Sequence, residues 1–156
     1  MNPKIIEQHS EADINVLAIV QRIIKHLSPE TLDGLQEIVI MDTNPDANAF
    51  GCYRKAHKRI ELYLDGITLW QPWLLKKTYL FPYLIIGMAL GHEIDHHVNR
   101  DKVNIDREAS AENNALPYVY PSLGLFKPVF RLFSLIARSR VNKSLKRDAA
   151  KDRRAP

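Results

Sequence analysis

Cysteine is almost absent from this chain of 156 residues, because Cys52 is the only one. A single cysteine excludes an intrachain disulfide and a zinc cluster built from thiolates, and we expect Cys52 to be a small buried apolar residue. Long apolar runs are also missing: no stretch approaches the roughly eighteen residues that suggest a membrane-spanning helix. The N-terminus lacks a charged patch followed by an apolar export segment. We therefore expect a soluble, cytoplasmic protein.

The net charge of +4 is unevenly distributed along the chain. The segment 127–156 has ten basic and two acidic residues, a net charge of +8, whereas the preceding residues have 12 basic and 16 acidic, a net charge of −4. We expect residues 1–140 to form one compact domain and residues 141–156 to form a basic, flexible tail. The tail is either solvated or contacts nucleic acid, an acidic partner or membrane lipid.

The periodicity of the apolar residues predicts an α+β protein with a small, mostly antiparallel or mixed sheet. Helices are expected over residues 10–27, 79–100, 106–117 and 123–140, and strands over residues 36–41 and in one segment that runs from 51–53 to 59–65. The first helix is expected to begin at Ser10 or Asp13. Asp106 is a good N-cap for the third helix, which Pro117 is expected to close. Residues 42–48 and 70–77 read as irregular.

The longest helical run ends in Gly91-His92-Glu93-Ile94-Asp95-His96, a His-Glu-x-x-His pattern. Residues four apart lie on one face of a helix, so His92 and His96 can direct imidazole nitrogens at a single ion. Glu93 lies about 100° round the helix, where it can reach a metal-bound water as a general base. The pattern can also be an ordinary solvated face. The apolar residues 83–90 favour the metal site, since a buried helix makes unpaired histidines costly.

A catalytic zinc needs a third protein ligand, for which His97, Glu108 and Glu112 are the candidates. His97 points about 100° away from the preceding histidine, so it is excluded unless the helix breaks. A third histidine six residues on is ruled out, since Lys102 stands there. Glu108 and Glu112 share one face of the next helix. We prefer Glu108 as the ligand and Glu112 as the carboxylate that holds a ligand histidine by its other ring nitrogen. The reverse assignment, and an ordinary acidic face near the helix dipole, stay open.

The two motifs together resemble those of a known family. The segments His92-Glu93-Ile94-Asp95-His96 and Arg107-Glu108-Ala109-Ser110-Ala111-Glu112 look like those of gluzincin metallopeptidases, in particular the small bacterial and phage zincins of the ImmA/IrrE type. The resemblance covers residues 38–117. It implies a zincin-like fold with a long active-site helix and a following ligand helix. It also implies zinc ligands at His92, His96 and Glu108, a general base at Glu93 and a supporting acid at Glu112. The strand 59–65 would be the edge strand that pairs with an extended peptide substrate.

The sequence therefore predicts a zinc metallopeptidase that acts on a peptide or protein substrate. Zn²⁺ would polarise the scissile carbonyl, and Glu93 would carry a proton from water to the leaving amine. Tyr118 or Tyr120 could supply the further donor for the oxyanion, because both follow the ligand helix directly. One alternative is a non-catalytic zincin-like module whose basic C-terminal segment binds a protein or nucleic acid. Another is a regulator that cleaves one specific protein.

Overall fold

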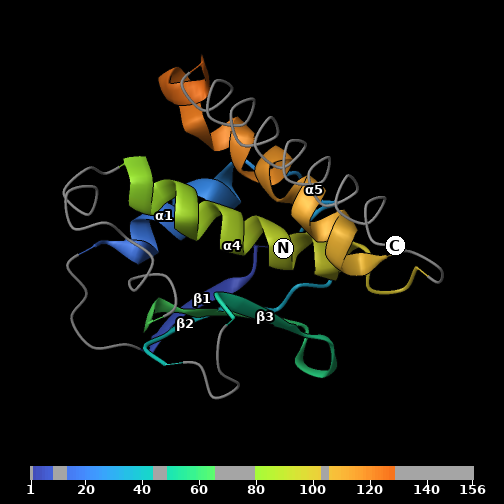
Figure 1. Cartoon of the computed structure of the whole chain (residues 1–156). Helices are drawn as coiled ribbons and strands as arrows, with labels where there is room; N and C mark the ends of the chain where they lie inside the picture. The colour runs from blue at the N-terminus through green and yellow to red at the C-terminus, as the bar shows by residue number, and fades with distance from the viewer. Residues whose placement is uncertain (1, 9–13, 44–48, 66–79, 103–105, 129–156) are drawn as a thin grey trace, which may run out of the picture. The chain divides into compact units, whose positions relative to one another are not determined.

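The structure, a computed structural model, describes residues 2–8, 14–43, 49–65, 80–102 and 106–128 (Figure 1). The chain divides into two compact units, residues 1–122 and 123–156. The sheet, the three described α-helices and the candidate site all belong to the first unit. The irregular segment 70–77, the domain boundary expected at residue 140 and the tail 141–156 lie outside the described residues, as does most of the helix expected over 123–140.

A mixed four-stranded sheet forms one layer of the first unit. Its strands are β1 (Lys4–Gln8), β2 (Glu37–Met41), β3 (Gly51–Arg54) and β4 (Arg59–Tyr63), in the spatial order β1-β2-β4-β3. β1 and β4 both run parallel to β2, and β3 runs antiparallel to β4. The expected α+β class and mixed sheet are confirmed. The prediction of a mostly antiparallel sheet is wrong, because two of the three strand pairings are parallel.

The position of β4 corrects the expectation that segment 59–65 forms the edge of the sheet. β4 lies between β2 and β3, so β3 and β1 are the edge strands of the described sheet. The sequence pattern merged two strands into one segment, but the chain reverses direction between them through a 3-10 turn, Lys55–His57, and Lys58 in the left-handed region (φ 49°). The sequence analysis did not predict β1. All of its side chains are half-exposed or exposed, so the strand lacks the apolar alternation by which it could be recognised.

Three helices were expected in the first unit, and their bounds differ slightly from the expectation. α1 (Val16–Lys25) begins later than expected, at Asn15, whose side-chain oxygen caps the helix by accepting the backbone N–H of Ala18 at 2.9 Å. The long helix is α4 (Leu80–Val98), with Pro82 in its first turn. Asp106 caps α5 (Arg107–Val119) by accepting the N–H of Ala109.

Pro117 does not close α5, which continues through it to Val119. The proline removes one backbone donor, and this loss falls within the last turn, where Val119 is fully buried. Residues Tyr120–Phe126 follow as 3-10 turns with a kink at Gly124 (φ 54°), where the sequence predicted the start of a helix at residue 123.

α4 lies between the sheet and α5, and contacts β3 and β4 as well as α1 and α5 (Figure 1). The alternating residues Ile38, Ile40, Ile60 and Leu62 lie on one face of the sheet and are fully buried, as a two-residue period requires. On α4, fully buried residues recur every four positions, at Ile86, Leu90 and Ile94. This stripe packs α4 into the core and leaves its opposite face to carry His92 and His96. None of the described helices is long and apolar enough to cross a membrane; the cytoplasmic location stays a prediction.

Candidate metal centre

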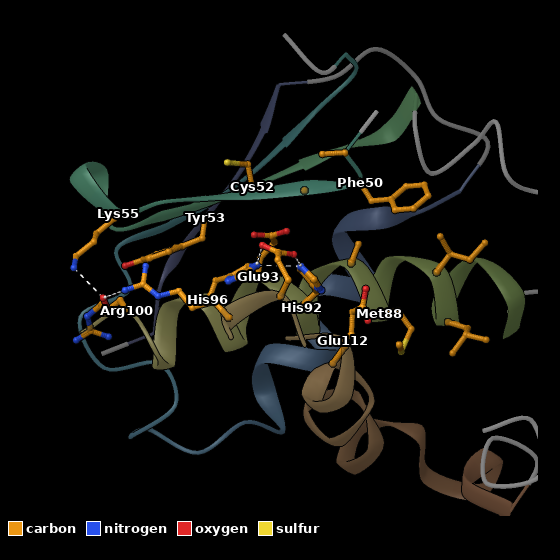
Figure 2. Close-up of a pocket in the computed structure, with 18 residues that line it drawn as sticks. Phe50, Cys52, Tyr53, Lys55, Met88, His92, Glu93, His96, Arg100 and Glu112 are labelled. Atoms are coloured by element: carbon orange, nitrogen blue, oxygen red, sulfur yellow. Dashed lines mark hydrogen bonds and ion pairs between the residues drawn. The ribbon is translucent and has the colours of Figure 1, made fainter. Parts of the chain in front are cut away.

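His92 and His96 lie one helical turn apart on α4, and their side chains converge as the spacing predicts. Their Nε2 atoms are 3.0 Å apart, and their rings meet edge to face with centroids 4.7 Å apart. Both side chains are half-buried. Figure 2 shows them on the side of α4 that faces the cavity below β3. Burial and the neighbouring His92 lower the pKa of His96, although Glu108 and Asp95 oppose this shift, so the neutral imidazole that a metal requires is favoured.

Glu108 is the third member of this group. Its two carboxylate oxygens lie 3.4 Å from Nε2 of His92 and 3.4 Å from Nε2 of His96. One ligand atom from each of the three residues lies within 4.8 Å of the others. Two imidazole nitrogens and one carboxylate oxygen are donors that catalytic zinc sites use, with the fourth position left to water or substrate. These residues therefore fit a zinc ion.

Glu112 and His97, the other two candidates for the third ligand, lie elsewhere. Glu112 lines the same cavity, but no hydrogen bond or ion pair in the described part of the chain joins it to His92 or His96. Its expected role of holding a ligand histidine is therefore not what the structure has. His97 points away from the group into the protein and is 1 % exposed.

α5 reaches α4 closely enough to place Glu108 because glycines line the crossing. A Cβ atom on Gly91 would collide with the backbone carbonyl of Ala115, and one on Gly87 would lie 2.8 Å from Cγ1 of Val119. Only glycine allows this approach without a shift of one helix. The close crossing of the two helices therefore brings Glu108 within reach of the two histidines.

Asp95 holds the crossing together from inside the His-Glu-x-x-His segment. Its carboxylate is 1 % exposed and accepts hydrogen bonds from four side chains. Ser110 donates at 2.7 Å, Asn99 at 2.8 Å, Asn114 at 3.1 Å and Tyr118 at 3.2 Å. Three of these donors belong to α5, so the buried carboxylate fixes α5, and with it Glu108, against α4.

Tyr118 contacts Asp95 in this structure, and the expected role of Tyr118 or Tyr120 as an oxyanion donor stays a prediction. The Tyr118 hydroxyl donates to Asp95, and burial together with the Asp95 charge raises its pKa to about 12. Neither Tyr118 nor Tyr120 lines the cavity. Both tyrosines come after Ala115, the last residue of α5 that lines the cavity. Their place in the sequence directly after the ligand residues therefore does not bring them to the site.

Glu93 occupies a separate position, under the edge strand. It is 6 % exposed, and its Cγ would lie 2.9 Å from a Cβ atom on Gly51. Burial raises the pKa of Glu93 to about 7; a hydrogen bond from the Tyr53 backbone lowers it, and the nearby Glu108 charge adds to the rise. A carboxyl group with a pKa near neutrality can both accept and release a proton at physiological pH.

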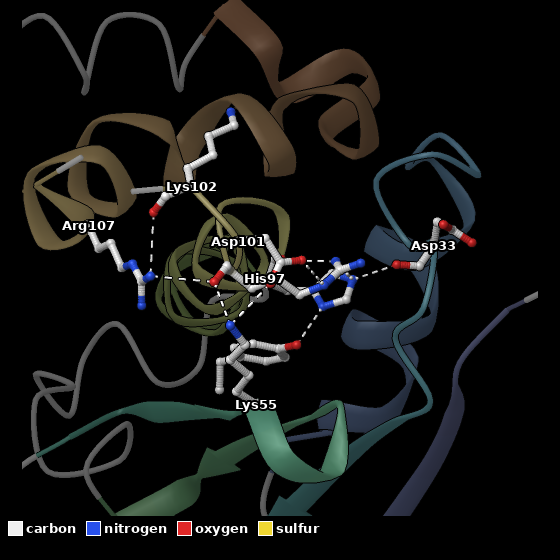
Figure 3. A network of polar contacts seen from close by, with 8 residues as sticks. Asp33, Lys55, His97, Asp101, Lys102 and Arg107 are labelled. Atoms are coloured by element: carbon white, nitrogen blue, oxygen red, sulfur yellow. Dashed lines mark hydrogen bonds and ion pairs between the residues drawn. The ribbon is translucent and has the colours of Figure 1, made fainter. Parts of the chain in front are cut away.

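β3 is held over α4 by Tyr53 and His97 (Figure 3). His97 Nε2 lies 3.0 Å from the Asp33 carbonyl, and Nδ1 lies 3.0 Å from the Tyr53 hydroxyl. Because a carbonyl only accepts, Nε2 carries the hydrogen and Nδ1 of the neutral ring accepts from Tyr53. Arg100 Nη1, 3.3 Å from Nε2, then donates to the His97 carbonyl at 3.1 Å and not to the ring. Burial lowers the pKa of His97 and favours this neutral form. The contact with His97 thereby fixes Tyr53, whose backbone N–H donates to Glu93.

The site opens into a cavity of about 900 Å³ between β3, α4 and α5, lined by His92, Glu93, His96 and Glu108 among others. This volume is within the range of ligand-binding pockets. Cys52 lines the cavity too and is only half-buried, so the expected buried cysteine is wrong. Sequence reasoning also missed Asp95, Gly51 and Tyr53 as residues that shape the site. Asp95 alone carried a signal, as an acidic residue within a buried helix.

Protein-family models, curated proteins and solved structures were compared with the chain, and none matches it.

Proposed function

We propose that the chain is a zinc metallopeptidase with a zincin-like arrangement of helix, ligand helix and edge strand. The observation that supports this most directly is the convergence of His92, His96 and Glu108, whose ligand atoms lie within 4.8 Å of one another. The resemblance to small zincins of the ImmA/IrrE type is part of the same proposal.

His92, His96 and Glu108 would hold Zn²⁺, which would supply a water whose pKa is lowered toward ~7 and would polarise the scissile carbonyl. Glu93, buried beside this group, would accept a proton from the attacking water and deliver it to the leaving nitrogen. The low exposure of Glu93 keeps bulk water from competing for this proton. The backbone N–H of Tyr53 and the close approach of Gly51 hold the carboxylate in place.

The substrate, a peptide in extended conformation, would add to the sheet beside β3. β3 is the edge strand and runs beside the cavity (Figure 2). An extended peptide can hydrogen-bond to such an edge through its main chain. This proposal replaces the strand 59–65 of the sequence-based expectation with β3.

The alternative is a non-catalytic module in which the metal is structural and the basic C-terminal segment binds a partner. Structural zinc sites commonly have four protein ligands, whereas the group found among the described residues offers three and faces a cavity. A nearly buried glutamate beside an open coordination position also favours catalysis.

The test compares metal content and peptide cleavage in four proteins: the wild type, Glu93→Gln, Glu108→Ala and Glu112→Ala. We expect about one zinc per chain in the wild type, in Glu93→Gln and in Glu112→Ala, and its loss in Glu108→Ala. Cleavage of a denatured protein such as casein should be lost in Glu93→Gln while zinc is retained. Wild-type protein without bound metal would overturn the proposal, and metal loss confined to Glu112→Ala would overturn the ligand assignment.

A further inference from the structure

A stripe of residues from α4 and the turn after it lines the cavity. Its members are spaced four residues apart, namely Leu84, Met88, His92 and His96 on α4, and Arg100 two residues beyond the helix end at Val98. Neighbouring members lie about one helical turn apart. The stripe changes character along its length, from apolar to metal-binding to cationic.

The apolar end lies on the Met88 side of the histidines (Figure 2). Leu84, Ile85 and Met88 of α4 are half-buried there, and Phe50, just before β3, is 37 % exposed. Large apolar side chains left in contact with solvent beside a reactive group mark a place for an apolar part of the ligand. Glu112, which lines the same half in Figure 2, disfavours an acidic group at this end.

The opposite end is basic. Lys55, Arg100 and Arg107 line the cavity there. Lys55 Nζ lies 3.1 Å and Arg100 Nε 3.4 Å from the carboxylate of Asp101. Arg107 donates to the carbonyl oxygens of Arg100 and Lys102. Among the described residues, Asp101 is the carboxylate paired with Lys55 and Arg100 (Figure 3). Three cations and one carboxylate leave a net charge of +2 at this end.

The length of α4 sets the distances between the three parts. Six residues separate the midpoint of the two histidines from Arg100 and likewise from Met88, which is about 9 Å in either direction at the helical rise. An extended peptide covers about 3.3 Å per residue. About three residues on each side of the scissile bond therefore reach the two ends.

We propose that this cavity selects peptides with an acidic side chain within about three residues of the scissile bond on the Arg100 side and a large apolar side chain at a similar distance on the Met88 side. This inference rests on the proposed peptidase function, whose site it extends. The cations attract the acidic group and Glu112 repels it, so charge fixes the direction in which the peptide lies beside β3. Lys55, Arg100 and Met88 are the specificity-determining residues.

The test uses fluorescein-labelled ten-residue peptides and the full-length Glu93→Gln protein, with and without added zinc. One peptide has glutamate three residues before and leucine three residues after the central bond, and a second has the reverse order. In two controls the glutamate of each order is replaced by glutamine. We expect the glutamate peptide of one order to bind three- to ten-fold more tightly than its glutamine control, and the difference to shrink at ~0.5 M salt.

A matched pair of variants locates the effect. Lys55→Glu should abolish the preference for glutamate, whereas Lys58→Glu makes the same charge change on an exposed lysine that does not line the cavity and should preserve it. Equal binding of glutamate and glutamine peptides, or no binding of any, overturns the inference. A protein that holds no zinc overturns the proposed function instead, and the zinc-free comparison still decides the inference.

Discussion

Replacing Ser110 by alanine tests whether the buried Asp95 carboxylate fixes α5 on α4. Ser110 donates to Asp95 at 2.7 Å and accepts from Asn99 at 3.3 Å and Asn114 at 3.2 Å. A hydrogen bond to a charged group contributes ~1.5–3 kcal/mol. Both amides keep their bonds to Asp95 in the variant, so no buried donor is left without a partner. We expect Ser110→Ala to lower the free energy of unfolding by about 2–3 kcal/mol.

Ser122→Ala is the matched control, because its hydroxyl also joins two segments but touches no charge. Ser122 Oγ donates to the Val119 carbonyl at 2.6 Å and accepts from the Tyr83 hydroxyl at 2.6 Å. Neutral hydrogen bonds contribute ~0.5–1.5 kcal/mol net. Ser122→Ala removes two such bonds, so we expect it to lower the free energy of unfolding by about 1–3 kcal/mol.

Both variants are unfolded in urea with a metal chelator present, followed by far-UV circular dichroism, so that metal binding does not enter the comparison. Zinc affinity is then measured by competition with a chromophoric chelator. Because α5 carries Glu108, Ser110→Ala should weaken zinc binding by about ten-fold, comparable to the loss of other supporting contacts, and Ser122→Ala should not. Equal losses of zinc affinity in the two variants would refute the idea that Asp95 positions Glu108 by anchoring α5.

Two further predictions concern the sheet. Gly51→Ala places a Cβ atom 2.9 Å from Cγ of Glu93, so it should displace the base and lower the cleavage rate ten-fold or more, while zinc content, measured alongside, stays at the wild-type level. Burial opposes ionisation of Glu61, but hydrogen bonds from Tyr63, Arg54 and Arg59 outweigh it and lower the Glu61 pKa. Its stabilising contribution is therefore present above the unfolded pKa of ~4.3 and is lost as pH falls through the lower folded value. Urea unfolding between about pH 6 and 3 should show the advantage of the wild type over Glu61→Gln shrinking on acidification, and a constant difference would contradict this.

Local patterns in the sequence predicted the helices that carry the site. The apolar run before His92 gave the extent of α4 to within two residues at each end, because a buried helix shows its burial in its own composition. Asp106 marked the start of α5 because capping is a local interaction between a side chain and the next turn. The convergence of Glu108 with the two histidines followed from these two elements and a short connection.

The order of the strands could not be predicted in the same way, since pairing is non-local. The polar alternation of segment 59–65 indicated a half-exposed strand, yet Glu61 is 3 % exposed. Its charge is matched by Arg54, 3.0 Å away, and by Arg59. A buried ion pair between neighbouring strands leaves the same sequence pattern as a solvated face. The turn between the two strands had no sequence signal, because Lys58 occupies the position with positive φ where glycine or asparagine is usual.

Successive residues of the His-Glu-x-x-His segment face different parts of the fold, because each turns by about 100° from the one before. His92 and His96 face the cavity, Glu93 lies under β3, and Ile94 is fully buried in the core. Asp95 faces α5, which carries the third member of the group. Ile94 and Asp95, at the two variable positions of the pattern, are thus as constrained by their contacts as the two histidines and Glu93. Ile94 anchors the helix and Asp95 anchors the next one, so the same five residues that offer two ligands and a base also bring the third ligand to them.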